Sequence, residues 1–216
     1  REICGAIEDG GVFVQQGTIE WVGEWEDRPP EAREEHVAQA KTGVVTPGWI
    51  DCHTHSVFAG DRADEFVLRN AGQSYADILE AGGGILNTVD SVREASLEEL
   101  TQGLFDRVFE FVRKGVTTLE VKSGYGLTLE DEMKMLRAVK KVRQEGVPCE
   151  LVPCFMGAHT IPREHRDDRE KYLDLVCNDM IPQVAEAGLA KYCDVFCDRG
   201  AFTVEEAERV LLTGKN

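Results

Sequence analysis

Two histidines separated by one residue, His53 and His55, are the side chains of this sequence best suited to hold a metal ion. They follow an apolar run over residues 44–52, which the pattern predicts to be a buried strand. Side chains alternate along a strand, so both imidazoles point to the same face and can share a ligand. Two hydrogen-bonded histidines at a strand end would have the same spacing, and the spacing alone favours neither interpretation.

Three further apolar runs have the composition of buried strands, over residues 116–122, 149–156 and 192–197. Four helices are predicted around them: three begin at the polar pairs Ser96 with Glu99, Thr128 with Asp131 and Thr203 with Glu206, and one spans residues 168–187 with a bend at Pro182. Alternating strands and helices indicate parallel βα units, in an α/β barrel or in a doubly wound sheet. Four strands are half of the eight in a closed barrel.

The first part of the chain has a different pattern. Residues 1–26 alternate apolar and polar with glycine between, which is typical of short antiparallel strands, and residues 27–41 form an exposed connection. We therefore expect one domain over residues 1–45 and another over residues 46–216. The sequence starts without methionine and stops soon after a helical pattern, so we expect it to be the front part of a longer protein.

Charge and cysteine content exclude several classes of function. The 24 Lys and Arg against 40 Asp and Glu give a net charge of −16, which argues against nucleic-acid binding. No apolar run approaches the ~20 residues that cross a bilayer. The seven cysteines, an odd number without CxxC spacing, are predicted to be reduced thiols buried in the core, which together with the lack of a signal peptide favours the cytoplasm.

Longer segments resemble the amidohydrolase superfamily. Residues 45–55 resemble its first-strand metal motif, and residues 58–66, 81–85, 120–127 and 155–159 narrow the likeness to the hydrolases that open 4-imidazolone-5-propanoate in histidine degradation. The Ser-Gly-Tyr-Gly motif over residues 123–126 is more specific than His-x-His. The resemblance implies a (β/α)8 barrel, with about its first four βα units in residues 46–216, and a small β-sandwich to which residues 1–45 contribute.

The resemblance also implies roles for particular residues. His53 and His55 would be ligands of one divalent metal ion, zinc or iron, which activates water; Arg62 would bind the substrate carboxylate, and Tyr125 and His159 the rest of the substrate. Each role has a structural alternative: Arg62 could pair with a neighbouring carboxylate, Tyr125 could cap the barrel interior, and His159 could be a hydrogen-bonded loop histidine. The remaining metal ligands and the acid/base residues are not assignable within residues 1–216, so this segment alone is expected to be inactive.

Three other features receive structural interpretations. Lys122 resembles the carboxylated lysine of binuclear relatives, but that group belongs on the fourth strand, so a single metal and a structural Lys122 are expected. Gly82, Gly83 and Gly84 are a weak phosphate-loop signal and are better explained by a flexible loop. His36 and His165 receive no role.

The leading hypothesis is therefore a metal-dependent hydrolase that converts 4-imidazolone-5-propanoate to N-formimidoyl-L-glutamate. Another amidohydrolase, such as a nucleobase deaminase, is the alternative within the superfamily, and Arg62 separates the two because a neutral base needs no cation. A catalytically inert truncated form is the alternative from a different class. The partners expected are a small-molecule substrate and, from the resemblance, a second copy in a homodimer.

Overall fold

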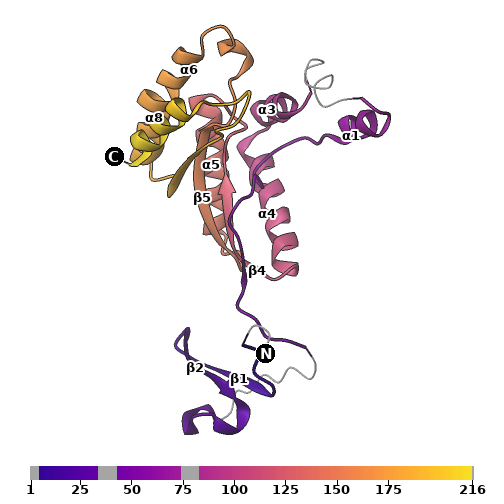
Figure 1. Cartoon of the computed structure of the whole chain (residues 1–216), viewed down its shortest axis with the longest axis vertical. Coiled ribbons are helices and arrows are strands. Elements are labelled where there is room, and N and C mark those ends of the chain that lie inside the picture. Colours follow the sequence, from indigo (N-terminus) through magenta and orange to yellow (C-terminus); the bar gives the residue numbers. More distant parts are fainter. Residues whose placement is uncertain (1–4, 34–42, 74–82, 216) are drawn as a thin grey trace. The chain divides into compact units, whose positions relative to one another are not determined.

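The structure, a computed structural model, describes residues 5–33, 43–73 and 83–215. The chain divides between Thr46 and Pro47 into two units, which are described separately below. Figure 1 shows the helices and strands of both units in the order of the sequence. His36 and Gly82 lie outside the described residues.

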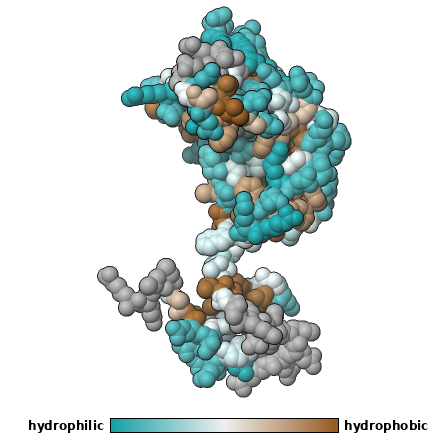
Figure 2. Space-filling view, turned by 90° about the vertical axis from the view of Figure 1, so that its right-hand side faces the viewer, coloured by the Kyte–Doolittle hydropathy of each residue, from teal (hydrophilic) through white to brown (hydrophobic). Residues whose placement is uncertain are grey.

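The small unit is built on a β-hairpin. Strands β1 (Gly10–Gln15) and β2 (Thr18–Glu24) pair antiparallel, and the short 3-10 turns η1 (Trp25–Asp27) and η2 (Pro30–Arg33) follow. The turn residues Gln16 and Gly17 both have positive φ angles, 50° and 80°, as the tight turn of a two-residue hairpin requires. Short antiparallel strands are thus confirmed here. Figure 2 shows hydrophobic side chains at the surface of this unit, where Val12, Val14, Ile19 and Val22 are exposed.

The large unit contains a parallel sheet of four strands: β3 (Trp49–Asp51), β4 (Val116–Lys122), β5 (Glu150–Ala158) and β6 (Tyr192–Val195). Their order in the sheet is their order in the chain. A doubly wound sheet reverses its strand order at a switch point, whereas a barrel adds each strand beside the last. The α/β class is confirmed, and the sequential order fits part of a barrel and not a doubly wound sheet.

Strand β3 is much shorter than the predicted run over residues 44–52. Val44 and Val45 are 87% and 73% exposed. Pro47 has no N–H to donate to a neighbouring strand, and β3 lies at an edge of the sheet with a partner on one side only. The apolar composition of residues 44–48 therefore does not produce a buried strand, and regular pairing starts at Trp49, whose N–H donates to the Gly115 carbonyl over 2.9 Å.

Nine helical segments in the described part of the large unit connect or follow these strands, and the local signals predicted several of their starts. They are α1 (Ala63–Asn70), α3 (Ile85–Glu94), α4 (Leu97–Arg113), α5 (Leu129–Gln144), η3 (Arg163–His165), α6 (Arg169–Leu175), η4 (Val176–Met180), α7 (Ile181–Glu186) and α8 (Val204–Lys215). The three predicted caps are confirmed: the side chains of Ser96, Thr128 and Thr203 accept the N–H groups of Glu99, Asp131 and Glu206. None of the described helices is long and apolar enough to cross a membrane.

The helix predicted over residues 168–187 is divided into α6, a π-helical turn η4 and α7. Pro182 lies in the first turn of α7, so the distortion falls before the proline and not at it. The reason is that a proline ring collides with the carbonyl four residues earlier and donates no hydrogen bond to it. The carbonyl affected is that of Asn178, inside the widened turn.

Helices cover the sheet and bury its apolar side chains: α4 packs on β4, α5 on β5 and α8 on β6. On β4, Leu119 and Val121 point into the core under α4 and α5, with Leu100, Leu104, Met135 and Val139. Each fully buried leucine or valine contributes roughly 1.5–3 kcal/mol relative to exposure. Because side chains alternate along a strand, Glu120 and Lys122 face the other side of the sheet.

The cysteines follow the prediction only in part. Cys149, Cys154 and Cys177 are buried, and Cys193 is half-buried; burial raises the pKa of Cys154 and Cys193 to about 12 each. Cys52 and Cys197 are exposed, so the prediction of buried core thiols is wrong for these two, which lie at the ends of apolar runs beyond β3 and β6. All six are free thiols, and Cys4 lies outside the described residues.

Candidate functional site

The His53–His55 pair lies directly beyond β3 and is held there by hydrogen bonds to β4. The Lys122 N–H donates to the Thr54 carbonyl over 3.0 Å, and the Thr54 hydroxyl donates to the Glu120 carbonyl over 2.5 Å. Thr54 is therefore buried against the sheet, while His53 is exposed and His55 half-buried. The two imidazole centroids are 5.6 Å apart.

Two aromatic side chains, Tyr125 and His159, gather beside His55 of this pair, so that rings from three strand ends meet. The rings of His55 and His159 are stacked, with centroids 4.5 Å apart and an interplanar angle of 10°. The Tyr125 ring lies 5.3 Å from each of them. His55 follows β3, Tyr125 follows β4 and His159 follows β5, so the carboxyl ends of adjacent parallel strands bring together residues 104 positions apart in the sequence.

The pKa values of both stacked histidines, His55 and His159, are lowered, which favours the neutral imidazole. Burial, followed by the proximity of His159, His53 and Lys122, lowers the pKa of His55 to about 3. Burial also lowers the pKa of His159; its hydrogen bond to Gly124 acts in the opposite direction, and the charge of Arg62 adds to the lowering. Neutral imidazoles carry a lone pair, which a metal ion or a hydrogen-bond donor can use.

The hydrogen-bond partners define what each ring can still bind. The His159 Nδ1 lies 2.9 Å from the Gly124 carbonyl, which can only accept, so Nδ1 carries the proton and Nε2 has the lone pair. The His55 Nδ1 is buried and has no hydrogen-bond partner in the described part of the chain. A buried nitrogen without a partner is costly, and a bound cation would remove that cost.

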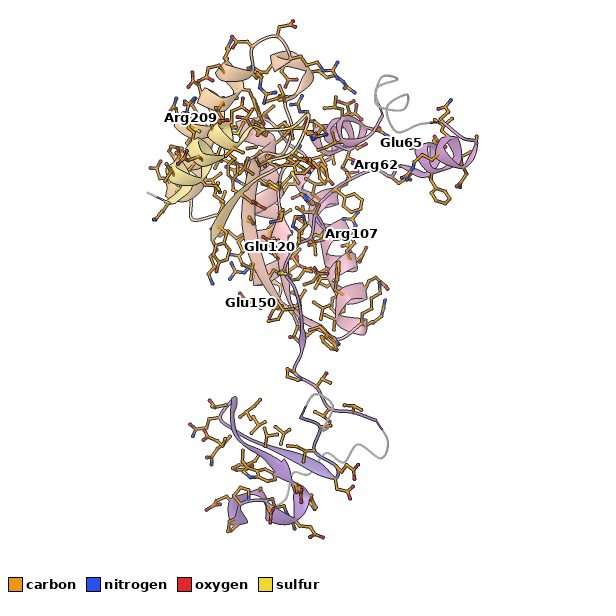
Figure 3. The ribbon with its side chains drawn as sticks, viewed as in Figure 1. Arg62, Glu65, Arg107, Glu120, Glu150 and Arg209 are labelled. Atoms are coloured by element: carbon orange, nitrogen blue, oxygen red, sulfur yellow. The ribbon has the colours of Figure 1, made fainter. Side chains whose placement is uncertain are left out.

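Arg62 precedes the first helix of the large unit, α1, and is turned towards α3. Its Nε donates to the Thr88 hydroxyl over 2.9 Å. Within the described ranges no carboxylate lies at ion-pair distance from Arg62, which removes support for pairing with Asp61, Asp64 or Glu65. Glu65, labelled near Arg62 in Figure 3, instead accepts the N–H of Gly84 over 2.9 Å.

The contact between Glu65 and Gly84 also argues against a phosphate-binding loop at Gly83 and Gly84. Gly84 has a φ of 74° and caps the N-terminus of α3, so a left-handed backbone explains the glycine. Its N–H, which an anion would need, is already taken by the Glu65 carboxylate, and the Asn87 amide donates to the same oxygen over 3.2 Å. The protein itself supplies the anion at this helix end.

Lys122 lies behind the histidines on the inner face of the sheet and is 3% exposed. Its ammonium donates to Glu120 over 2.6 Å and to Asp194 over 2.8 Å, which ties β4 to β6 across β5. The ammonium of Lys122 is thus engaged in two ion pairs, in agreement with the structural role expected for this residue. The roles of Glu120 and Asp194 are not visible in the sequence, because Asp194 is 72 positions from Lys122 and only the fold brings them together.

A further residue that the sequence did not reveal is Glu132, which is fully buried on α5. Burial raises its pKa, whereas the Ser123 hydroxyl and the N–H groups of Leu127, Gly126 and Gly124 act to lower it. A signal was present in the sequence, since Glu132 is three residues from Leu129 and four from Leu136, the spacing that puts residues on one face of a helix. A charged residue on such a face needs partners inside the protein.

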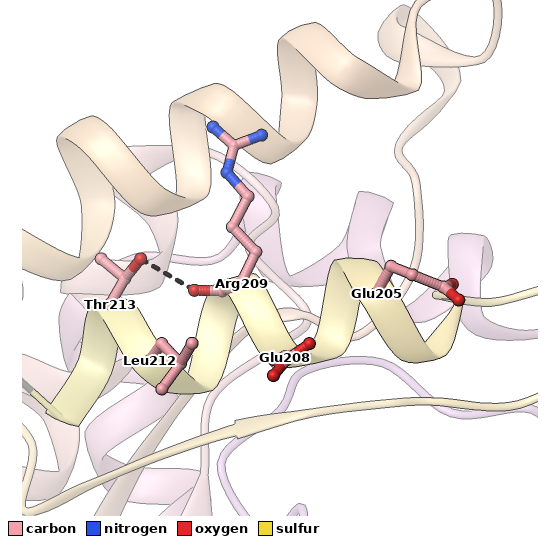
Figure 4. Close-up of a pocket in the computed structure, with 5 residues that line it drawn as sticks. All are labelled: Glu205, Glu208, Arg209, Leu212 and Thr213. Carbon is pink, nitrogen blue, oxygen red and sulfur yellow. Dashed lines mark hydrogen bonds between the residues drawn. The ribbon is translucent and has the colours of Figure 1, made fainter.

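A surface hollow lies apart from these residues. Figure 4 shows it along α8, where Glu205, Glu208, Arg209, Leu212 and Thr213 line it. All five belong to one helix, and the Thr213 hydroxyl donates to the Arg209 carbonyl of that same helix over 2.8 Å. None of the predicted site residues takes part, so we do not assign this hollow a role in the site.

Sequential parallel strands with polar and aromatic side chains gathered beyond their carboxyl ends fit part of an α/β barrel, a class whose sites are built from the loops at that end. Over nearly its whole length the chain is similar to imidazolonepropionases, which confirms the resemblance seen in the motifs. No protein-family model matches the chain.

Three relatives illustrate the similarity. The imidazolonepropionase of Myxococcus xanthus is 48% identical over 206 residues, which are 94% of this chain and 49% of the relative. That of Brevibacillus brevis is 46% identical over 212 residues, 96% of this chain and 50% of the relative. That of Shewanella piezotolerans is 44% identical over 216 residues, which are 100% of this chain and 53% of the relative. The chain spans about half the length of the curated relatives it matches.

Proposed function

We propose that the full-length protein is a hydrolase that opens the ring of 4-imidazolone-5-propanoate to give N-formimidoyl-L-glutamate in histidine degradation. The observation that carries the proposal is the meeting of His55, Tyr125 and His159 at three strand ends, in a chain 43–48% identical to imidazolonepropionases. One water molecule is consumed and one ring C–N bond is broken. The assignment concerns the full-length protein because the comparison covers about half of each relative.

His53 and His55 fit a metal ion and would hold it. Their ring centroids are 5.6 Å apart, His55 is neutral, and its buried Nδ1 has no partner in the described residues. The described part of the chain contains no group of three or more potential ligands, so further ligands would come from outside it. A single divalent ion, zinc or iron, is expected, and when bound it supplies the Lewis acidity that lowers the pKa of water toward ~7.

The side chains around this position have distinct tasks towards the substrate. Arg62 would bind the propionate carboxylate, since its planar guanidinium suits a carboxylate and no described carboxylate neutralises it. His159 would accept a ring N–H at Nε2, because its Nδ1 proton is committed to Gly124. Tyr125 would contact the ring edge through its phenol and limit access of bulk water.

For the full-length protein we propose the architecture that the family resemblance implies. The sheet β3 to β6 would supply the first four strands of a closed (β/α)8 barrel over residues 46–216, and residues 1–45 would contribute the hairpin β1–β2 to a small β-sandwich. We also propose a cytoplasmic homodimer, as expected from the family resemblance and the reduced thiols.

Turnover of 4-imidazolone-5-propanoate by the purified full-length protein tests the function. The ultraviolet absorbance of the substrate should fall when protein and zinc or iron are present, and a chelator should stop the reaction. Unchanged absorbance with metal supplied would remove the assignment. Turnover of a neutral nucleobase in its place would favour the deaminase alternative, which has no need of Arg62.

A further inference from the structure

The loop that carries Tyr125 is held by a buried carboxylate from the helix that follows it. Glu132 lies in the first turn of α5 and is 0% exposed. Its Oε1 accepts the N–H groups of Gly126 and Leu127, each over 2.8 Å, and its Oε2 accepts the N–H of Gly124 over 2.9 Å. Three main-chain donors on one carboxylate leave little freedom to residues 123–127.

The backbone of this loop needs such support. Gly124 has a φ of 103° and Leu127 a φ of 57°, and the left-handed region is unfavourable for a leucine. A Cβ at Gly124 would lie 2.8 Å from the Met156 carbonyl, and one at Gly126 would lie 2.5 Å from the backbone at Asp131 and Glu132. The glycines around Tyr125 are thus required by close packing of the protein on itself.

The same loop controls His159. The Gly124 whose N–H is bound by Glu132 also presents its carbonyl to His159 Nδ1 over 2.9 Å. One carboxylate therefore fixes the residues on both sides of Tyr125 and the group that orients the His159 ring. Glu132 itself is hydrogen-bonded to the backbone of the loop, through the N–H groups of Gly124, Gly126 and Leu127.

Arg93 on α3 holds the loop from another side. Its Nε donates to the Gly126 carbonyl over 2.8 Å, and its Nη2 donates to Glu164 over 2.7 Å. Gly126 is thus bound at both its N–H and its carbonyl, by side chains from two different helices. This arrangement fixes a peptide unit more firmly than a single contact would.

We propose that Glu132, assisted by Arg93, is a positioning residue that sets Tyr125 and His159 in place for the substrate without touching it. The inference rests on the proposed function, because it concerns the side chains assigned there to the substrate. It predicts that weakening the hydrogen bonds of Glu132 to the loop, here called the clamp, alters substrate affinity through Tyr125. A purely structural Glu132 would alter stability alone.

Kinetics of Glu132→Gln in the full-length enzyme test the proposal. The amide has one accepting oxygen and points an NH₂ group at an N–H donor, so at least one loop bond is lost. We expect KM for 4-imidazolone-5-propanoate to rise roughly tenfold or more, as for loss of a hydrogen bond to a charged group, with a smaller change in kcat and unchanged metal content. Glu130→Gln, on the exposed side of the same helix turn, is the matched control and should leave KM unchanged.

The Tyr125→Phe background separates positioning from stability. If Glu132 acts through Tyr125, Glu132→Gln should raise KM less in this background than in the wild type, because the phenol contact is already gone. Equal increases in both backgrounds, or no increase with the protein folded, would overturn the proposal.

Hydrogen exchange makes the test independent of activity. The amides of residues 123–128 should exchange faster in Glu132→Gln, while those in the middle of α5 exchange as in the wild type. If the wild type turns nothing over, the proposed function fails and the exchange result still decides whether Glu132 holds the loop. If Glu132→Gln does not fold, Arg93→Lys must produce both the faster exchange and the Tyr125-dependent rise in KM. Unchanged exchange and KM in that variant would contradict the proposal.

Discussion

His55 combines a neutral imidazole with a buried Nδ1 that has no protein partner in the described residues. We expect His55→Gln to reduce the metal content of the full-length protein from about one ion per chain to a small fraction, because one of few ligands is removed. Metal analysis after dialysis measures this. His165→Gln is the control, since the His165 ring packs on Tyr172 and not on the rings of His55, Tyr125 or His159. Full metal content in His55→Gln would show that the ligands lie elsewhere.

Arg62 is a cation without a carboxylate partner in the described part of the chain, hydrogen-bonded to Thr88. Arg62→Ala should raise KM with little effect on kcat, at a cost of about 1.5–3 kcal/mol for a charged hydrogen bond to the substrate carboxylate. Steady-state kinetics check this. Arg69→Ala, at the exposed end of α1, is the matched control, and an equal KM in wild type and Arg62→Ala would return Arg62 to a structural role.

Among the elements, β4 and β6 are tied together by a buried charge network that crosses β5. Lys122 bonds both Glu120 and Asp194, and the second oxygen of Glu120 is buried without a partner in the described residues. Lys122→Met would leave both carboxylates without their cation, with the Glu120 side chain only 15% and the Asp194 side chain 36% exposed. We expect the free energy of unfolding to fall by about 3–5 kcal/mol, the usual effect of removing one partner of a buried pair.

Urea unfolding of the full-length protein measures that loss. Lys141→Met is the matched control, because Lys141 pairs with Glu98 on the surface over a similar distance, 2.9 Å, and exposed pairs contribute little. If Lys122→Met lowers the free energy of unfolding no more than the control does, the inner face of the sheet is well hydrated and the charge network contributes little.

At the scale of the whole molecule, the same network predicts an acid limit of stability. Burial acts to raise the pKa of Asp194, but the hydrogen bonds and charge of Lys122 and the Val195 N–H outweigh it, and the pKa is lowered. A carboxyl group whose pKa is lowered by folding stabilises the fold above its unfolded pKa of about 3.9 and loses that effect as the pH falls through the folded value.

The difference in Tm between wild type and Asp194→Asn should therefore be largest near neutral pH and shrink below about pH 4, where the wild-type carboxylate becomes protonated. Calorimetry between pH 3 and pH 7 checks this, with Asp198→Asn as an exposed control. A Tm difference that stays constant down to pH 3 would contradict the assignment of the stabilisation to the ionised Asp194.

The sequence predicted the parts of the fold that depend on local signals. The caps at Ser96, Thr128 and Thr203 and the strand over residues 116–122 follow from spacing that a few neighbouring residues determine. The sequence-based prediction failed where tertiary contacts determine the structure. Val44 and Val45 are as apolar as the residues of a buried strand, but they are exposed and belong to no strand. The choice between a barrel and a doubly wound sheet also needed the observed strand order.

The candidate site divides in the same way. His53, His55, Arg62, Tyr125 and His159 could be named from motifs, but their distances could not, because they depend on how adjacent strands end. Glu132 and Asp194 escaped notice because each acts on a partner from another element, and single-sequence patterns do not identify partners. Their charge on otherwise apolar faces was the only local sign.

The hold of Glu132 on main-chain N–H groups has a consequence for how this site can change. A clamp that binds backbone amides does not depend on the side chain at position 125, so Tyr125 can be exchanged without loosening the loop that presents it. Ligand preference and loop architecture are therefore separately adjustable at this position. For directed evolution of new specificities, position 125 is a place to vary, and Gly124, Gly126 and Glu132 are the places to keep.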